Sequence, residues 1–117
     1  MATTVLIVDD HPSFRDSARR MLEADGYEVV GEAADGISAT DAARQLQPDV
    51  VLLDIRLPDT DGFKVAERLA ANGAAPAIVL TSSGERSDFA YEIVASSAEG
   101  FIAKSELSAE AVTLLIR

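Results

Sequence analysis

Short apolar runs of strand length recur along the chain, at residues 5–8, 27–34, 50–53, 77–80 and 100–103. The first, third and fourth runs are continuously apolar, which is typical of parallel strands that are covered on both faces. Each run is followed by a segment whose apolar residues have helical spacing. The pattern therefore predicts five strands that alternate with five helices.

The predicted helices share apolar positions that repeat every three or four residues, with polar residues between them. These positions are Phe14, Ala18, Met21 and Leu22; Ala39, Ala42, Ala43 and Leu46; Val65, Ala66, Leu69 and Ala70; Phe89, Ala90, Ile93 and Val94; and Ala111, Leu114 and Leu115. Turn-forming pairs separate the elements, at Asp25-Gly26, Asp35-Gly36, Gln47-Pro48 and Asn72-Gly73. Pro12 suits the first turn of a helix, so we expect its neighbour His11 to have a loop or helix-entry role.

Strands that alternate with helices of this length predict an α/β fold of the (βα)5 type. Right-handed crossovers would place helices on both faces of a doubly wound parallel sheet. The common strand order for five strands is 2-1-3-4-5, which gives a flavodoxin-like three-layer sandwich. No internal repeat or linker interrupts the pattern, and we expect one domain over residues 1–117.

The composition excludes several classes of function. The chain has 117 residues, no cysteine and a formal net charge of −10, with Lys64 and Lys104 as its lysines. A disulfide framework and a thiolate metal site are therefore excluded, and a direct nucleic-acid interface would need clustered positive charge. The sequence has neither a signal-peptide pattern nor an apolar run of about twenty residues, which a membrane-spanning helix needs. We expect a cytoplasmic protein.

Polar residues with chemical potential stand at the ends of four predicted strands. They are Asp9 and Asp10 after the first strand, Asp54 after the third, Thr81, Ser82 and Ser83 after the fourth, and Lys104 after the fifth. Ligands of open α/β sheets bind outside the carboxyl ends of the strands, where the strand order reverses. For the order 2-1-3-4-5 this place lies between the first and third strands. The carboxylates and the ammonium group should therefore meet at one edge of the sheet.

Three carboxylates at one place need a compensating charge, because like charges raise one another's pKa. Mg²⁺ is a suitable cation, since proteins hold it with one or two carboxylates, waters and a phosphate oxygen. With Mg²⁺ and Lys104 the charges add to −3 + 2 + 1 = 0. Such a neutral site suits an aspartate that attacks a phosphoryl group. Asp54 is the candidate nucleophile, because it ends the central strand.

These residues resemble the receiver domain of bacterial two-component response regulators. The resemblance covers essentially the whole chain and rests on four segments in order. They are VDD at 8–10, LLDIRLPDTDG at 52–62, VLTSS at 79–83 and FIAKS at 101–105. Each segment alone is weak, but together, each at a strand end, they are specific.

The resemblance implies a role for each site residue. Asp54 would accept a phosphoryl group from a histidine kinase or a phosphotransfer protein, without turnover as an enzyme. Asp9, Asp10, Asp54 and the backbone carbonyl of Arg56 would hold Mg²⁺, and Lys104 would pair with the phosphoryl oxygens. Thr81 corresponds to the switch hydroxyl and Phe101 to the aromatic residue that moves with it. A shift of one residue at the end of the strand would give the role of Thr81 to Ser82.

Phosphorylation should act as a switch, since it replaces a charge of −1 with about −1.5 to −2. Hydrogen-bond donors would then move toward Asp54 and reshape the fourth helix and the fifth strand. The altered surface would control a partner, or an output domain absent from this chain, or a homodimer through the fourth helix, fifth strand and fifth helix. For the Arg56 side chain, control of water access and simple solvent exposure are equally open.

Three other functions compete with this interpretation. A phosphatase that forms an aspartyl-phosphate would need a second acid two residues after the nucleophile, where this chain has Arg56. A nucleotide-binding module would need a glycine-rich phosphate loop, and neither G-x-G-x-x-G nor G-x-x-x-x-G-K-[ST] follows the first strand. A receiver-like module that only binds a protein stays open, although every acceptor and metal position is present.

Overall fold

The strands form one parallel sheet in the order β2-β1-β3-β4-β5, as predicted. The computed structural model describes residues 2–71 and 75–117. The strands are β1 (Thr4–Val8), β2 (Glu28–Ala33), β3 (Val50–Asp54), β4 (Ala77–Ser82) and β5 (Gly100–Ala103). The strand order reverses between β1 and β3, so the carboxyl ends of these two neighbours meet.

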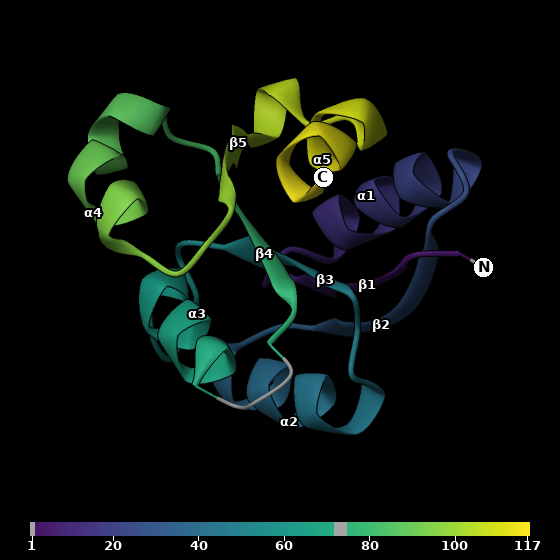
Figure 1. The fold of residues 1–117 in the computed structure, drawn as a ribbon, viewed down its shortest axis with the longest axis horizontal. Helices are drawn as coiled ribbons and strands as arrows, with labels where there is room; N and C mark the ends of the chain where they lie inside the picture. The colour runs from purple at the N-terminus through teal and green to yellow at the C-terminus, as the bar shows by residue number, and fades with distance from the viewer. Residues whose placement is uncertain (1, 72–74) are drawn as a thin grey trace.

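Helices cover both faces of the sheet and complete the predicted three-layer sandwich (Figure 1). One face carries α1 (Pro12–Ala24) and α5 (Ala109–Ile116). The other carries α2 (Gly36–Leu46), α3 (Gly62–Ala70) and α4 (Ala90–Ala95). Two short 3-10 turns, η1 (Arg86–Phe89) and η2 (Lys104–Glu106), precede α4 and α5.

The core lies on both sides of the sheet because successive strand residues point to opposite faces. In β3, Val51 and Leu53 pack toward α2 and α3, whereas Val50 and Leu52 pack toward α1 and α5. All four are at most 1% exposed. This double coverage explains why the strand is apolar throughout and why Asp54, which ends it, is unusual.

The predicted helix faces are correct for the first three helices, apart from Leu46 of α2, which is 43% exposed, and partly wrong for the last two. Val94 is 86% exposed and Leu114 is 62% exposed, although both were predicted to face the core. Helix α4 has only six residues and buries Ile93 alone. In α5 the side chain of Ser108 caps the helix, and this start turns Ala109 and Val112 to the sheet instead.

Two predicted strand ends also need correction. The second strand is Glu28–Ala33, shorter than predicted, and the fourth continues to Ser82, so Thr81 lies inside it. The predicted Asn72-Gly73 turn lies outside the described residues. Within the described part of the chain, no helix has the length and apolar character that would let it cross a membrane.

Candidate functional site

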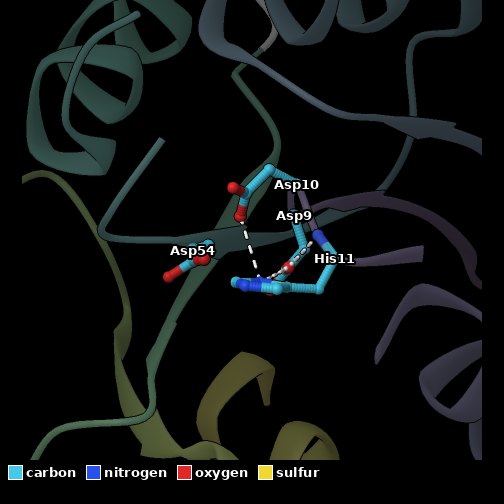
Figure 2. Close-up of side chains that lie close together, drawn as sticks. All are labelled: Asp9, Asp10, His11 and Asp54. Atoms are coloured by element: carbon cyan, nitrogen blue, oxygen red, sulfur yellow. Dashed lines mark hydrogen bonds and ion pairs between the residues drawn. The ribbon is translucent and has the colours of Figure 1, made fainter. Parts of the chain in front are cut away.

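Two buried carboxylates lie side by side at the carboxyl edge of the sheet. Asp9 directly follows β1 and Asp54 ends β3, and the preceding residues Val8 and Leu53 are paired across these strands. Asp9 is completely buried and Asp54 is 3% exposed. Figure 2 shows both side chains with those of Asp10 and His11. The predicted convergence of these aspartates is what the strand order produces.

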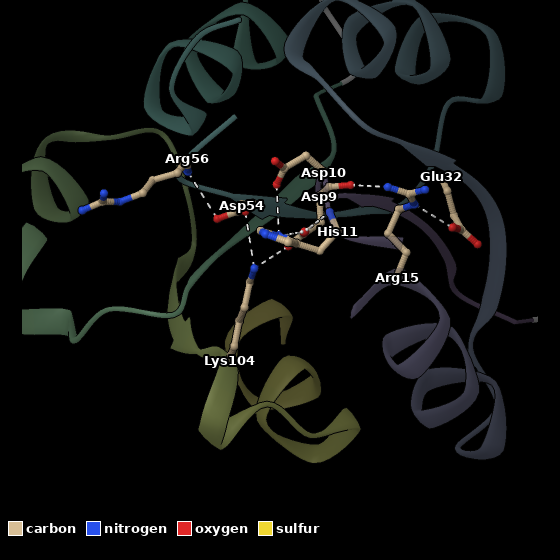
Figure 3. Close-up of polar contacts among 8 residues, drawn as sticks. All are labelled: Asp9, Asp10, His11, Arg15, Glu32, Asp54, Arg56 and Lys104. Carbon is tan, nitrogen blue, oxygen red and sulfur yellow. Dashed lines mark hydrogen bonds and ion pairs between the residues drawn. The ribbon is translucent and has the colours of Figure 1, made fainter. Parts of the chain in front are cut away.

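Lys104 provides a positive charge between the two buried carboxylates (Figure 3). Its Nζ lies 2.6 Å from Asp9 Oδ2 and 3.4 Å from Asp54 Oδ2. The same Nζ lies 4.5 Å from the centre of the Phe14 ring of α1. Lys104 begins η2, directly after β5, so the end of the fifth strand reaches across to the first and third.

The three groups differ in how the site shifts their pKa values. Burial raises the pKa of Asp54, and the negative charge of Asp9 adds to this effect. For Asp9, burial opposes ionisation, but the contacts with Lys104 and the His11 backbone outweigh it and lower the pKa. Burial also opposes the charge of Lys104, and its carboxylate partners nevertheless raise its pKa. Asp9 and Lys104 therefore form a stabilised ion pair, whereas the ionised form of Asp54 is disfavoured.

Asp10 and His11 form the exposed rim of this cluster. The Nδ1 atom of His11 lies 3.0 Å from Asp9 Oδ1 and 3.1 Å from Asp10 Oδ1. The His11 backbone N–H donates to Asp9 Oδ1 at 2.8 Å. His11 is the N-cap residue of α1, which confirms its helix-entry role. Its side-chain contact with both aspartates was not predicted, although the adjacent letters DDH were a signal for it.

The donor set fits a divalent cation. One ligand atom from each of Asp9, Asp10, His11 and Asp54 can be chosen so that all lie within 4.8 Å of one another. Three of these donors are carboxylate oxygens, the ligand type that Mg²⁺ prefers. The Arg56 backbone also reaches the site, because its N–H donates to Asp54 Oδ1 at 3.2 Å.

A cavity of about 200 Å³ opens beside these groups. Its lining residues are Asp10, His11, Asp54, Arg56, Leu57, Pro58, Ser82, Ser83 and Lys104. Ser82 thus lines the cavity. The side chain of Thr81 is completely buried, and its Oγ1 has no hydrogen-bond partner among the described residues.

The side chains of Arg56 and Phe101 both lie near Phe89. The Arg56 side chain extends away from Asp54 (Figure 3), and its guanidinium lies 5.9 Å from the centre of the Phe89 ring. Phe101 is 5% exposed, and its ring centre lies 6.5 Å from that of Phe89. Phe101 is therefore packed inward, and Phe89 of η1 contacts both residues.

The loop between β3 and α3 is held by its own aspartates. Asp59 accepts from the backbone N–H groups of Gly36 and Ile37 at the start of α2, at 2.8 and 3.0 Å. Asp61 caps α3 by accepting from the Lys64 backbone at 2.9 Å. A Cβ atom at Gly62 would lie 2.4 Å from the carbonyl oxygen of Asp54. The aspartates and glycine of DIRLPDTDG therefore fix the backbone next to the candidate nucleophile.

Comparison with known proteins assigns the family. The sequence profile of the response regulator receiver domain matches residues 5–116. The chain belongs to this family. Receiver domains act in two-component signal transduction as phosphoacceptors, and they generally bind Mg²⁺ at an acidic pocket. This receiver domain has an acidic cluster, formed by Asp9, Asp10 and Asp54 with His11, at the carboxyl edge of its sheet.

Relatives and solved structures agree with this assignment. The transcription regulator BvgA of Bordetella pertussis is 39% identical over 106 residues, which are 91% of this chain and 51% of BvgA. The nitrate/nitrite response regulator NarP of Escherichia coli is 38% identical, over 86% of this chain and 47% of NarP. The signal receiver domain of a NarL response regulator from Mycobacterium tuberculosis has a TM-score of 0.88 and 32% identity, and the match covers 98% and 96% of the two chains.

The receiver domain spans about half the length of these two curated relatives. The similarity therefore concerns the receiver portion of each relative.

Proposed function

We propose that this receiver domain accepts a phosphoryl group on Asp54 from the phosphohistidine of a histidine kinase or a phosphotransfer protein. The observation that carries the proposal is the position of Asp54. It is a buried carboxylate with a raised pKa, it lines a cavity, and it lies 3.4 Å from a lysine. A carboxylate that neighbouring groups do not fully compensate is a suitable nucleophile.

The phosphoryl transfer needs only the donor and the protein, with one proton taken from water. A carboxylate oxygen of Asp54 forms a bond to phosphorus, and the bond between phosphorus and the donor imidazole nitrogen breaks. The electron pair of that bond stays on the imidazole, which takes up a proton. Lys104 is placed to pair with the oxygens of the transferred group. The product is an acyl phosphate on the protein itself, so the domain acts without turnover as an enzyme.

Mg²⁺ would be held by Asp9, Asp10, Asp54 and the backbone carbonyl of Arg56. When bound, it supplies positive charge next to the phosphoryl oxygens. The ligand atoms of the three aspartates lie close enough together for one ion, and the Arg56 backbone already contacts Asp54. Asp10 is the exposed member of the set, which leaves that side open for waters and for the phosphoryl group.

A hydroxyl at the end of β4 would respond to the new charge on Asp54. The resemblance gives this role to Thr81, and the cavity lining favours its neighbour Ser82. The Ser82 hydroxyl accepts from the Gly84 backbone at 3.0 Å, so its movement would pull on the loop that leads to η1. Phe89 of η1 contacts Phe101, which links this loop to the predicted aromatic switch.

The output surface would be formed by α4, β5 and α5, either for a homodimer or for an output domain. Tyr91 is 82% exposed, and Val94 and Leu114 are also exposed, which supports this surface. The relatives named above are regulators about twice as long as this chain. A single receiver domain over residues 1–117, a cytoplasmic location and the absence of direct nucleic-acid contact remain predictions.

One experiment tests the proposed function. The protein is incubated with acetyl phosphate, with and without Mg²⁺, and its intact mass is followed. We expect a gain of one phosphoryl group that needs Mg²⁺ and is absent in Asp54→Asn. No gain in the wild type would favour the module that only binds a protein. Steady release of phosphate from added monoesters would favour the phosphatase.

A further inference from the structure

An arginine of α1 contacts the peptide that joins the two aspartates after β1. Arg15 Nη1 donates to the Asp9 carbonyl oxygen at 2.6 Å. On the other side of the same residue, the Asp9 backbone N–H donates to the Ala33 carbonyl oxygen at 3.0 Å. The backbone of Asp9 is thus fixed by the neighbouring strand at its nitrogen and by the guanidinium at its carbonyl.

Arg15 is itself held in place by a residue of the edge strand. Its Nε donates to Glu32 Oε1 at 2.9 Å, and the other oxygen of Glu32 accepts from Arg19 Nε at 2.8 Å. The Arg15 side chain is 17% exposed and that of Glu32 is 29% exposed. Figure 3 shows the resulting chain from Glu32 through Arg15 to Asp9. A planar guanidinium can make both contacts at once, because its donors have a fixed geometry.

The contact matters because of the direction of two adjacent side chains. Successive residues of a strand point to opposite faces, so Asp9 and Asp10 can share one cation only if the chain turns between them. The carbonyl that Arg15 binds belongs to the peptide at this turn. The guanidinium therefore acts on the bond whose orientation decides where the Asp10 carboxylate lies.

We propose that Arg15, held by Glu32, is a positioning residue that orients the Asp9–Asp10 peptide for binding a divalent cation. The proposal rests on the proposed function, because it assigns the support of the same acidic site. Outer groups that orient metal ligands commonly change metal affinity by 10- to 100-fold when they are removed. Arg15 touches a backbone atom of a ligand residue and has no part in the phosphoryl transfer itself.

Arg19 offers a matched control on the same helix. It carries the same charge and binds the same glutamate, but its other contacts are the Val29 carbonyl and Glu23. Arg15→Ala and Arg19→Ala therefore remove the same charge and one bond to Glu32 each. Only Arg15→Ala also removes the contact with the Asp9 carbonyl.

The test is a calorimetric titration of the whole chain with Mg²⁺. We expect Arg15→Ala to raise the dissociation constant of Mg²⁺ about tenfold, and Arg19→Ala to leave it within about twofold of the wild type. Arg15→Lys should raise the dissociation constant of Mg²⁺ by less than Arg15→Ala does. It should not restore the wild-type value, because an ammonium lacks the fork that reaches both partners. At saturating Mg²⁺ the rate of phosphorylation by acetyl phosphate should return to near the wild-type value in Arg15→Ala.

The outcomes separate this inference from the proposed function. Equal weakening in Arg15→Ala and Arg19→Ala would overturn the inference, since charge or helix stability would then explain both. Unchanged affinity in Arg15→Ala would also overturn it while leaving the proposed function intact. A wild type that binds no Mg²⁺ would contradict both. If Arg15→Ala does not fold, Arg15→Lys replaces it, because an ammonium removes the fork that joins Glu32 to the Asp9 carbonyl; its dissociation constant for Mg²⁺ should then exceed that of Arg19→Ala, and equal values would overturn the inference.

Discussion

Lys104 lies closer to Asp9 than to Asp54, with its Nζ 2.6 Å from the first carboxylate and 3.4 Å from the second. The lysine therefore compensates mainly the charge of Asp9, which we assign to metal binding and not to the attack on phosphorus. The candidate nucleophile keeps a charge that is only partly balanced. Burial raises the pKa of both carboxyl groups; at Asp9 the contacts with Lys104 and the His11 backbone outweigh it, whereas at Asp54 the pKa stays raised.

Removing the lysine should destabilise the protein and strengthen its response to Mg²⁺. Lys104→Met leaves two buried carboxylates without their cation, and breaking such a pair costs about 3 kcal/mol of unfolding free energy. Saturating Mg²⁺ should recover much of this loss, because it compensates the same charge. Urea denaturation with and without Mg²⁺ measures both effects. A variant that Mg²⁺ stabilises no more than the wild type would contradict this description of the site.

Replacing the nucleophile by its neutral analogue should stabilise the protein. Because the pKa of Asp54 is raised, its ionisation costs stability above that raised value and costs nothing below the ordinary pKa of an aspartate. We expect Asp54→Asn to be more stable at about pH 7, by roughly 1 kcal/mol or about 4 °C in the melting temperature. The gain should disappear at about pH 3, where a wild-type aspartate is mostly protonated.

Asp9→Asn should show the opposite dependence on pH. The lowered pKa of Asp9 means that its ionised form stabilises the fold above the ordinary aspartate pKa, and this contribution is lost as the pH falls through the lowered value. The substitution should therefore cost stability at neutral pH and little in strong acid. Thermal melts of both variants across the same pH range make the comparison. The same sign for both variants would show that the two carboxylates do not have the distinct environments described here.

The two hydroxyls at the end of β4 can be separated by substitution. Thr81→Val removes a buried hydroxyl that has no partner among the described residues, and should raise the unfolding free energy by about 1 kcal/mol. Ser82→Ala should weaken the change that beryllium fluoride, a phosphoryl mimic, causes in the NMR signals of α4. An unaltered response in Ser82→Ala, with a lost response in Thr81→Val, would return the switch role to Thr81.

The glycine that starts α3 can be tested for its support of the nucleophile. The Cβ atom of Gly62→Ala would approach the Asp54 carbonyl oxygen to 2.4 Å, so the loop must move. Overpacking of this kind costs about 1–3 kcal/mol. Chemical denaturation measures the cost. Gly26→Ala is not a suitable control, because Gly26 has a φ of +93° and any side chain there would strain the backbone. Ala71→Gly, at the other end of the same helix, tests whether any change in α3 has this effect.

The sequence predicts much of the fold and the centre of the site for one reason. In a parallel sheet the residue after each strand has a known place, so Asp9, Asp54 and Lys104 could be brought together from the strand pattern alone. Helix α4 was less predictable, because six residues make too few turns for periodicity to decide which side Val94 takes. The contact of Arg15 with Asp9 depends on Glu32 from another strand, and no local pattern indicates it.

The central claim is that Asp54 carries the phosphoryl group, and the most direct test locates the modified residue. After phosphorylation with acetyl phosphate and Mg²⁺, borohydride reduces an aspartyl phosphate to homoserine, which peptide mass spectrometry can locate. We expect homoserine at position 54, and none at positions 9 and 10. Reduction at either of those two aspartates, or at no aspartate in a protein whose mass shows a bound phosphoryl group, would contradict the account.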